Sequence, residues 1–498
     1  MTADLARALV LAALLLLWAV WGVRQLRHLL HMLQQHSYVN RRLWRWLLAD
    51  PVRFIRPLDL KPKKPLVFTG RAVRIFTGAL VLLAVEMAEA VLIIVRTGTA
   101  WSYLFAAAFA LTTAVLIPAA NTLLVPVQRA INGRFLRAAG ERLRTVRPIV
   151  IGITGSYGKT STKHFLHALL SARYRSLMTP GSYNTTMGVC RVINEQLQPD
   201  HDVFIVEMAA YGKGEIKEIA DLVHPRIGIL TAIGPQHLEW FGTIENTAAT
   251  KYELIETLPA DGVAVFNADD PRCRALADRT TRVKVLRYGL APSDRPRLRA
   301  EGIAHGPGGL SFALVDASGT RLPVATKLLG RHNVLNVLAA ATVALELGLS
   351  LQDVAEGIAR LQAPDHRLQL LDGAAGVTVI DDAYNANPDG AAEALEVLRQ
   401  FGGRRILVTP GMVELGPVQD DANRAFGRQA AAACDHVVLV GPAQTRSIRT
   451  GLDDAAFPTA QVTTVDTLEE AALVLQRILK PGDTVLFEND LPDLYAES

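Results

Sequence analysis

The stretch "RPIVIGITGSYGKTSTKHFLHALL", residues 147–170, predicts a strand, a glycine-rich loop and a helix in succession. In this setting the backbone N–H groups from Gly155 to Lys159 can surround a polyphosphate, and the helix dipole adds positive potential. The strict G-x-x-x-x-G-K-[ST] pattern fails at Ile153, where it requires glycine. The flanking strand and helix nevertheless favour a phosphate loop over a bare glycine turn. We therefore expect the β- and γ-phosphates of ATP here, with Lys159 on the terminal phosphates and Thr160 on magnesium.

The composition divides the chain into an apolar first part and an ordinary α/β remainder. Its 498 residues are too many for one hydrophobic core and predict about three units. Apolar residues make up 50% of the chain and charged residues 20%, and both biases are strongest in the first 130 positions. We expect a membrane region over 1–147, a central nucleotide-binding domain over 148–364 and a C-terminal domain over 365–498.

Charge and cysteine usage exclude several classes of function. The net charge of +4 is small, and much of the excess base lies beside the apolar runs, so it concerns membrane orientation and not nucleic acid. Cys190, Cys273 and Cys434 are widely separated and form no C-x-x-C pair. They therefore predict neither a disulfide framework nor a zinc site, and a reducing cytosol suits this part of the chain.

Two or three apolar stretches near the N-terminus are candidate membrane spans. The first is 8–23, the second is 75–95, and the uncharged stretch 97–128 holds a third that is kinked or ended at Pro118. A cleaved signal peptide is the alternative for the first stretch, but its basic cluster follows the apolar run instead of preceding it. We therefore predict a multi-pass membrane region.

The basic residues predict how this region is oriented. Arginines and lysines are abundant between the first two stretches and again after the third, whereas Arg96 alone separates the second from the third. Because loops rich in Arg and Lys stay in the cytoplasm, we expect the basic loop and the following domains on the cytoplasmic side of the cytoplasmic membrane, with the N-terminus outside.

Polar residues within the membrane region leave two alternatives open. Glu86 and Glu89 lie on one helical face near the middle of the second span, where an unpaired charge is costly. They are either hydrogen-bonded contacts between helices, which we favour, or a polar contact for a lipid-linked substrate or partner. The segment "SYVNRRLWRWLLADP" predicts an amphipathic helix at the headgroup level, as scaffolding or as a lipid-headgroup site.

Three polar residues that could take part in metal binding or catalysis come after the phosphate loop in the sequence. "HDVFIVEMAAYGKGEI" predicts a buried strand with Glu207 at its end, where a carboxylate completes a magnesium shell. "ILTAIGPQHLEWFGT" repeats the arrangement with His237, and "ATKYELI" presents Lys251 on a helix. Each residue alone is more often structural, so the ordered series carries the prediction.

Alternating strands and helices predict an α/β protein with mainly parallel sheets. "VFIVEM", "IGILTAI" and "GVAVFNA" belong to the central domain, and 280–328 is expected to form a small antiparallel insert. "VTVIDDA", "RILVTPG", "HVVLVG" and "TVLFEN" predict a second, Rossmann-like unit in the C-terminal domain. Ligands of such sheets bind at the carboxyl ends of the strands.

A longer series of motifs resembles the Mur ligase family, and within it the MurF branch, which adds D-alanyl-D-alanine to the peptidoglycan precursor. The series runs in order through "GITGSYGKTST", "GSYNTTMG", "VEMAA", "QHLEWFG", "TKYELI", "FNADD", "GRHNVLNVLAAATVALELG", "HRLQLL", "DDAYNANPD" and "ELG". It covers about two thirds of the chain. The resemblance implies that ATP phosphorylates a substrate carboxylate and that an amine attacks the acyl phosphate to give an amide.

The resemblance also implies roles for individual residues. Thr160 and Glu207 would share one magnesium ion, and His237 would support a second together with Lys251, which family members carbamylate. Catalytic roles would fall to Lys159, Glu207, His237 and Lys251. ATP contacts would come from Gly155, Ser156, Gly158, Lys159, Thr160, Ser161, Asn333, Asn336, Arg367, Asp381, Asn385 and Asn387, with Arg331 and His332 beside them. Asn184, Thr185 and Thr186 would contact substrate.

Three departures from the MurF pattern concern the substrates. Nothing before Arg147 resembles the domain that binds the UDP-sugar end of the precursor. "TPGMVELG" has Gly411 where an aspartate is usual, and "DTVLFENDLPDLY" stands where a lysine-glycine-serine-arginine type motif is expected. The acids Glu488, Asp490 and Asp493 replace base there, so we expect a preference for a cationic amine over D-alanyl-D-alanine.

Two classes of function follow from these observations. The first is a membrane-anchored ATP-dependent amide ligase that acts on a muropeptide-like, lipid-linked or other amino-acid polymer acceptor and an amino acid or dipeptide amine. The second is a non-catalytic membrane scaffold that binds nucleotide. The presence of Lys159, Thr160, Glu207, His237 and Lys251 favours catalysis.

Overall fold

The computed structural model describes residues 3–49, 65–97, 100–181, 183–235, 238–292, 296–373, 376–384 and 386–490. The chain divides into two compact units, the first up to Arg134 and the second from Phe135. Helix α6 (Val125–Val146) contains this boundary. Its last turns belong to the second unit, where Ala139 and Leu143 are buried in the core and Arg142 Nε donates to the Leu197 carbonyl at 2.6 Å.

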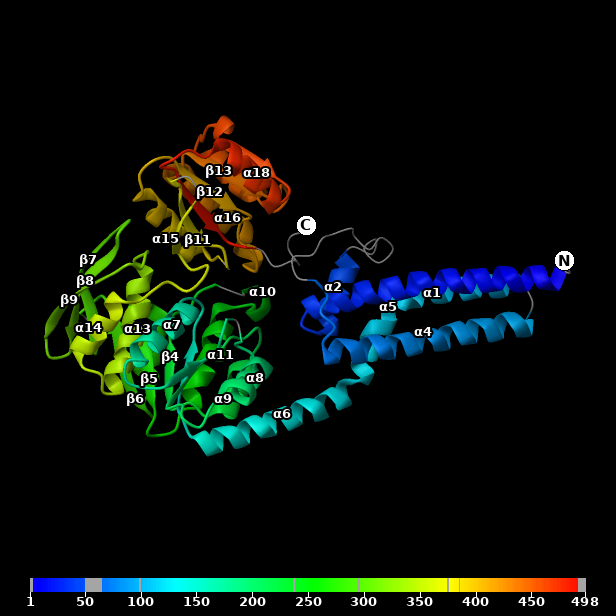
Figure 1. The fold of residues 1–498 in the computed structure, drawn as a ribbon, viewed down its shortest axis with the longest axis horizontal. Helices are drawn as coiled ribbons and strands as arrows, with labels where there is room; N and C mark the ends of the chain where they lie inside the picture. The colour runs from blue at the N-terminus through cyan, green and yellow to red at the C-terminus, as the bar shows by residue number, and fades with distance from the viewer. Residues whose placement is uncertain are drawn as a thin grey trace. The chain divides into compact units, whose positions relative to one another are not determined.

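The first unit is helical throughout its described part. It consists of α1 (Ala3–Gln35), α2 (Asn40–Ala49), α4 (Gly70–Thr97) and α5 (Ala100–Leu123), followed by the start of α6. Helices α1, α4 and α5 run alongside one another (Figure 1). Apolar side chains such as Leu16 and Leu17 of α1 and Val85 and Val95 of α4 are exposed, as expected for a surface that faces lipid.

Two helices of this unit are long and apolar enough to cross a membrane, at Leu9–Gln35 and Gly70–Thr97. A third crossing is formed if residues 111–123 and α6 count as one span, bent by 42°. By length and composition this agrees with the predicted two or three spans. The first apolar helix is longer than predicted, and α5 passes through Pro118 and ends at Leu123, so its bend does not fall at the proline.

Polar contacts join the helices of the first unit. Thr112 Oγ1 of α5 donates to Glu86 Oε1 of α4 at 2.8 Å, which is the contact between helices that we favoured, while Glu89 is exposed. The predicted amphipathic helix forms as α2. Its Leu43, Trp46 and Leu47 are buried inside the unit, so this apolar face packs on neighbouring helices instead of lying on lipid.

The second unit begins with a nine-stranded sheet in the order β2-β3-β1-β4-β5-β6-β7-β8-β9. The strands are β1 (Ile149–Thr154), β2 (Ser176–Met178), β3 (Val203–Glu207), β4 (Ile227–Leu230), β5 (Val263–Asn267), β6 (Lys284–Gly289), β7 (Leu298–Gly306), β8 (Gly309–Asp316) and β9 (Arg321–Thr326). Pairing is parallel up to β7 and antiparallel from β7 to β9, so the predicted antiparallel segment extends the main sheet.

Helices cover both faces of this sheet (Figure 1). One face packs against α7 (Lys159–Leu170), α13 (His332–Glu346) and α14 (Leu351–Ala359). The other packs against α8 (Thr186–Gln196), α9 (Glu215–Val223), α11 (Ile244–Glu256) and α12 (Pro271–Arg279), with the short α10 (Leu238–Phe241) beside α11. Strands β1, β3, β4 and β5 are therefore almost continuously apolar and buried, as parallel strands between two helical layers must be.

A second sheet forms the C-terminal domain, in the order β10-β11-β15-β12-β13-β14. Its strands are β10 (Gln369–Asp372), β11 (Thr378–Asp382), β12 (Arg405–Thr409), β13 (His436–Val440), β14 (Val462–Val465) and β15 (Thr484–Glu488), parallel except for β10. Helices α15 (Pro388–Arg399), α16 (Gln419–Ala433), α17 (Arg446–Asp454) and α18 (Leu468–Ile478) accompany it, with short 3₁₀ turns at Gly416–Val418 and Thr459–Gln461. The predicted α/β class with mainly parallel sheets is confirmed.

Candidate active site

The phosphate loop connects the end of β1 to the start of α7. Gly155 has φ 153° and Gly158 has φ 78°, conformations that L side chains rarely adopt. A β-carbon at Gly155 would overlap the Thr231 side chain, and one at Gly158 would overlap the side-chain oxygen of Asn336. Both glycines are therefore needed for the loop to lie this close to its neighbours.

Hydrogen bonds hold the loop against the segment that follows β4. Ser156 N donates to the Ala232 carbonyl at 2.7 Å, and the buried Ser156 hydroxyl donates to the Gly234 carbonyl and accepts from the Gly234 N–H. Thr231 Oγ1 donates to the Tyr157 carbonyl. Ser156 thus anchors the loop as well as lining the cavity described below.

Lys159 turns back over its own loop. Its Nζ donates to the carbonyls of Gly155 at 2.7 Å and Ser156 at 3.2 Å. Burial lowers the pKa of Lys159 to about 8, against the opposing effect of the Glu207 carboxylate. A polyphosphate would offer this ammonium stronger, charged acceptors than two carbonyls.

A cavity of about 220 Å³ is lined by residues of this loop and of the C-terminal domain. Nine of the predicted ATP residues line it: Ser156, Gly158, Lys159, Thr160, Ser161, Asn333, Asn336, Arg367 and Asn387. Other polar residues line it too, namely Tyr157, Thr231, Asn267, Tyr288, His332, Asp382, Asp389, Glu393 and Glu488. Residues from both α/β domains therefore form one site.

Glu207 lies beside the loop as the last residue of β3. It is 3% exposed, its Oε2 accepts from Lys163 Nζ at 3.0 Å, and its Oε1 accepts from Asn184 Nδ2 at 3.1 Å. Burial raises the pKa of Glu207, but Lys163 and Lys159 outweigh it and hold the pKa below its ordinary value. The carboxylate is thus ionised and already neutralised by Lys163.

The three predicted substrate residues differ in their contacts. Asn184 contacts the carboxylate directly. Thr185 is the N-cap of α8, where its hydroxyl accepts from the Gly188 N–H at 3.3 Å, and Thr186 is the first residue of that helix. The exposed Thr185 therefore has a structural role in this structure.

Lys251 is buried within α11, with its Nζ 5.9 Å from the centre of the Phe241 ring. Burial, with a further contribution from Lys159, lowers the pKa of Lys251 well below its ordinary value. The neutral amine is the form that reacts with carbon dioxide, and burial favours that form of a lysine, so the environment fits the carbamylation that the resemblance implies. His237 and Asn385 lie outside the described residues.

The oxygen donors present suit magnesium bound together with a nucleotide. Within the ranges that the structure describes, no three His, Cys, Asp or Glu side chains group closely enough to hold a metal ion by themselves. Mg²⁺ in phosphate-transfer sites usually takes one or two carboxylates plus substrate phosphates. The Thr160 hydroxyl at the cavity and the ionised Glu207 supply such a partial set.

The two asparagines of α13 brace the cavity wall. Asn333 Nδ2 donates to the Leu329 carbonyl at 2.8 Å, and its Oδ1 accepts from Asn336 Nδ2 at 3.0 Å. Thr162 Oγ1 of α7 lies 3.5 Å from Asn336 Oδ1. The start of α13 is therefore fixed against the helix that follows the phosphate loop.

In the C-terminal domain, adjacent residues of β11 have opposite environments. Asp381 Oδ2 lies 2.8 Å from His366 Nδ1, away from the cavity lining, whereas Asp382 lines the cavity. Successive strand residues point to opposite faces, so Asp382 and not the predicted Asp381 faces the site. Arg367 lies 4.1 Å over the Tyr384 ring, and Asn387 is the N-cap of α15, accepting from the Gly390 N–H.

The end of β15 contributes Glu488 and Asn489. Glu488 is 1% exposed and is the register partner of Asp382 on the neighbouring strand. Asn489 has φ 71°; its Oδ1 accepts from the Ala386 N–H at 3.0 Å, and its Nδ2 donates to the Gly411 carbonyl. A β-carbon at Gly411 would lie 3.0 Å from Asn423 Oδ1, so an aspartate does not fit there without movement. Two departures from the MurF pattern, Gly411 and the segment containing Asn489, are therefore in contact.

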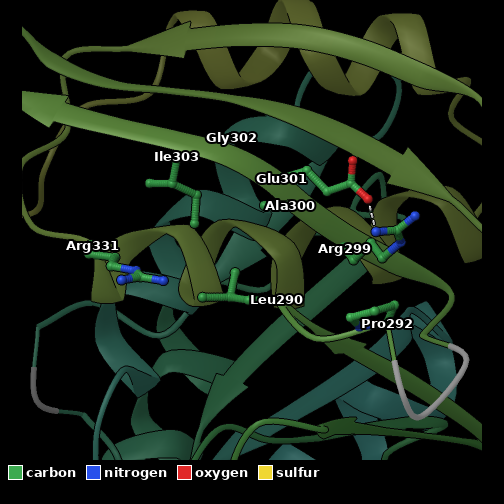
Figure 2. Close-up of a pocket in the computed structure, with 8 residues that line it drawn as sticks. All are labelled: Leu290, Pro292, Arg299, Ala300, Glu301, Gly302, Ile303 and Arg331. Carbon is green, nitrogen blue, oxygen red and sulfur yellow. Dashed lines mark ion pairs between the residues drawn. The ribbon is translucent and has the colours of Figure 1, made fainter.

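A second hollow, of about 390 Å³, lies at β7 (Figure 2). Figure 2 shows the ion pair between Arg299 and Glu301 on one side, and Arg331 on the other, with Leu290 and Ile303 between them in this view. Of the residues that the sequence singled out, Arg331 lines this hollow, whereas His332, Asn333 and Asn336 line the cavity of the phosphate loop.

Comparison with known proteins agrees with this geometry. Family models for the Mur ligase middle domain and for the Mur ligase glutamate ligase domain match residues 153–344 and 366–488. The UDP-N-acetylmuramoyl-tripeptide--D-alanyl-D-alanine ligase of Escherichia coli (strain K12) is 32% identical over 345 residues, covering 68% of this chain and 75% of that protein. Its namesake from Mycobacterium tuberculosis (strain H37Rv) is 35% identical over 364 residues, covering 68% and 69%.

A solved structure gives the same result. MurF from Thermotoga maritima in complex with ADP is 26% identical, with a TM-score of 0.64, and the match covers 73% of this chain and 81% of that one. The fold, the residues that line the cavity and these similarities all indicate the same family. The chain belongs to the Mur ligase family of ATP-dependent acid–amino-acid ligases.

Proposed function

We propose that this chain is a membrane-anchored ligase of the MurF type that acts in the synthesis of cell-wall or envelope precursors. The observation that carries the proposal is the cavity that joins the phosphate loop to Arg367 and Asn387 of the C-terminal domain. In this proposal residues 1–147 anchor the protein in the membrane, residues 148–364 bind the nucleotide, and residues 365–498 close over the nucleotide.

The reaction begins with transfer of a phosphoryl group. A carboxylate oxygen of the acceptor attacks the γ-phosphorus of ATP, the bond to the β,γ-bridging oxygen breaks, and ADP leaves. Lys159 moves from the Gly155 and Ser156 carbonyls to the transferring phosphate, while the loop amides and the start of α7 stabilise its charge. Arg367 supplies a second cation from the opposite wall.

The amide bond forms in the second half of the reaction. The neutral amine attacks the acyl carbon, phosphate leaves from the tetrahedral intermediate, and the amine gives up a proton. Water would hydrolyse the acyl phosphate, so the C-terminal wall of the cavity must close during this period. Thr160, Glu207, His237 and carbamylated Lys251 would hold two magnesium ions, which neutralise charge on the phosphates.

The nature of the acceptor follows from the relatives and from the first unit. The curated relatives are named for UDP-N-acetylmuramoyl-tripeptide and D-alanyl-D-alanine. Nothing before Arg147 resembles a UDP-sugar-binding domain, and the described helices there include two candidate spans, so the proposed acceptor is muropeptide-like and is presented beside the membrane, either soluble or linked to lipid. Anchoring would place the product where envelope precursors are used.

Product formation by the full chain in detergent tests the proposal. We expect phosphate release that requires ATP, a muropeptide acceptor and an amine together, with the amide identified by mass spectrometry. Lys159→Ala should reduce the rate by at least 100-fold, while the exposed Lys213→Ala serves as the matched control and keeps the rate. Joining at the unmodified rate by Lys159→Ala would refute the mechanism, and nucleotide binding without turnover for every pair would favour the scaffold.

Membrane attachment needs a separate test. Membranes from cells that express the full chain are washed with alkaline carbonate, which strips peripheral proteins. We expect this chain to stay in the pellet, because two apolar helices are long enough to span the bilayer. Release into the wash would contradict the anchor and leave the ligase proposal intact.

A further inference from the structure

Two carboxyl groups lie side by side where the C-terminal sheet meets the cavity. Asp382 ends β11 and Glu488 ends β15, and these neighbouring parallel strands pair Asp382 with Glu488 in register. Register partners on adjacent strands point to the same face and are about 5 Å apart. Both residues accordingly line the cavity that contains Lys159 and Asn387.

The pair is not neutralised by the protein in the way that Glu207 is. Glu488 is 1% exposed, and its buried Oε2 receives no hydrogen bond from the described part of the chain. Burial, and then the Asp382 charge, raise the pKa of Glu488 well above its ordinary value against the opposing Arg367 guanidinium, and burial raises the pKa of Asp382 against Arg367 and His332. The Arg367 guanidinium can balance only one of the two negative charges, so the pair favours sharing a proton.

The surrounding charges show what would replace this proton. Asp389 and Glu393 also line the cavity, with Glu393 3.8 Å from His332, and the Arg367 guanidinium lies over the Tyr384 ring. Within the segment where the resemblance implies a basic motif, β15 ends in the acid Glu488. These acidic side chains would therefore stabilise a cation that replaces the proton between Asp382 and Glu488.

We propose that Asp382 and Glu488 form a subsite for a second, non-reacting ammonium group of the incoming amine. This inference rests on the proposed ligase function. An ammonium carries three N–H donors and can bridge two carboxylates, whereas Mg²⁺ requires about six oxygen ligands in octahedral geometry. The natural amine is therefore a diamino compound or a peptide with a cationic side chain, and its binding releases the shared proton to solvent.

Matched amines that differ in this one group test the subsite. The full chain is assayed for amide formation with lysine against norleucine and with D-alanyl-D-lysine against D-alanyl-D-norleucine. The norleucine side chain ends at the ε-carbon as a methyl group and lacks the ammonium. One charged hydrogen-bonded contact is worth about 1.5–3 kcal/mol, so we expect kcat/KM to favour the cationic member by about 10-fold to 150-fold. Equal kcat/KM within a pair would overturn the inference.

Variants at Glu488 locate the preference. Glu488→Gln keeps the shape of the protonated acid, and we expect it to abolish the preference while KM for ATP changes by less than about twofold. Glu488→Lys should reverse the preference, and the exposed Glu396→Gln of α15 is the matched control that keeps it. A thermal unfolding transition like that of the unmodified chain confirms that each variant is folded.

The outcomes separate three explanations. A higher KM for ATP in Glu488→Gln, with the amine preference retained, would mean that the pair serves the nucleotide. A changed dependence of the rate on Mg²⁺ concentration, with the preference retained, would mean that it binds metal. Either result overturns the inference. Failure of every amine to form an amide would instead refute the proposed function, whereas amide formation without preference refutes the subsite alone.

Discussion

Replacing Lys163 by methionine should strongly destabilise the central domain, because it leaves the Glu207 carboxylate buried without its counter-ion. Lys163 is fully buried, and its Nζ lies 3.0 Å from Glu207 Oε2 and donates to the Gly181 carbonyl at 3.0 Å. Removing one partner of a buried ion pair costs about 3–5 kcal/mol. Asn184 still donates to Glu207 and Lys159 remains nearby, so we expect the lower half of this range.

Hydrogen exchange measured by mass spectrometry on the full chain in detergent suits this prediction, because it reports on peptides of β1 and β3 separately from the first unit. A loss of about 3–4 kcal/mol corresponds to exchange that is faster by about 150-fold to 900-fold. The matched control is Arg191→Met, since the Arg191–Glu195 pair is more than half exposed on both sides and its loss should leave the exchange of these peptides unchanged.

A double-mutant cycle with Glu207→Gln separates the ion pair from simple packing. The double variant removes both charges, so its loss should be smaller than the sum of the two single losses by at least about 2 kcal/mol. Additive losses, or a Lys163→Met loss below about 1 kcal/mol, would refute the reasoning.

Three further predictions concern the nucleotide site. Lys159 has a pKa of about 8 in the ligand-free protein, so it is charged below that pH, and phosphate favours the charged form. The Kd for ATP should therefore be constant below pH 8 and rise by up to tenfold per pH unit above it. Calorimetry in two buffers should show that ATP binding is accompanied by proton uptake above pH 8. Gly158→Ala should weaken ATP binding by at least tenfold, because its methyl group would displace Asn336, whereas Gly306→Ala, which has open space, should leave the Kd unchanged. Burial lowers the pKa of Lys251 and so favours the neutral amine that reacts with carbon dioxide. Depletion of carbon dioxide should therefore lower ligase activity, and bicarbonate should restore it. ¹³C-bicarbonate should give a carbamate signal that Lys251→Arg lacks.

Much of the architecture was predictable because its signals are local. The apolar runs of β1, β3 and β4, the glycines of the loop and the position of Glu207 at a strand end all follow from short stretches of sequence. These features locate the nucleotide side of the site. The motifs that resemble the family then extend the prediction to residues that contribute from distant parts of the chain.

The remaining features depend on packing between segments. The strand order β11-β15 pairs Asp382 with Glu488, and no local pattern shows that these strands are neighbours. Likewise, the choice between Asp381 and Asp382 requires knowing which face of β11 meets the cavity, and Asn267 and Tyr288 look like ordinary residues at the ends of core strands. In the first unit, the amphipathic pattern of α2 predicts a helix but does not show that Leu43 and Trp46 pack on protein.

Asn489 has a consequence for anyone who wishes to redesign this enzyme. Its side-chain amide links the β11–α15 connection at Ala386 to the β12–α16 connection at Gly411 through two hydrogen bonds. Transplanting the whole basic motif of a relative would cut the link along with reversing the charge. Single substitutions at Glu488 keep the hydrogen bonds of Asn489, so they can change the selectivity for the amine without destabilising the two connections.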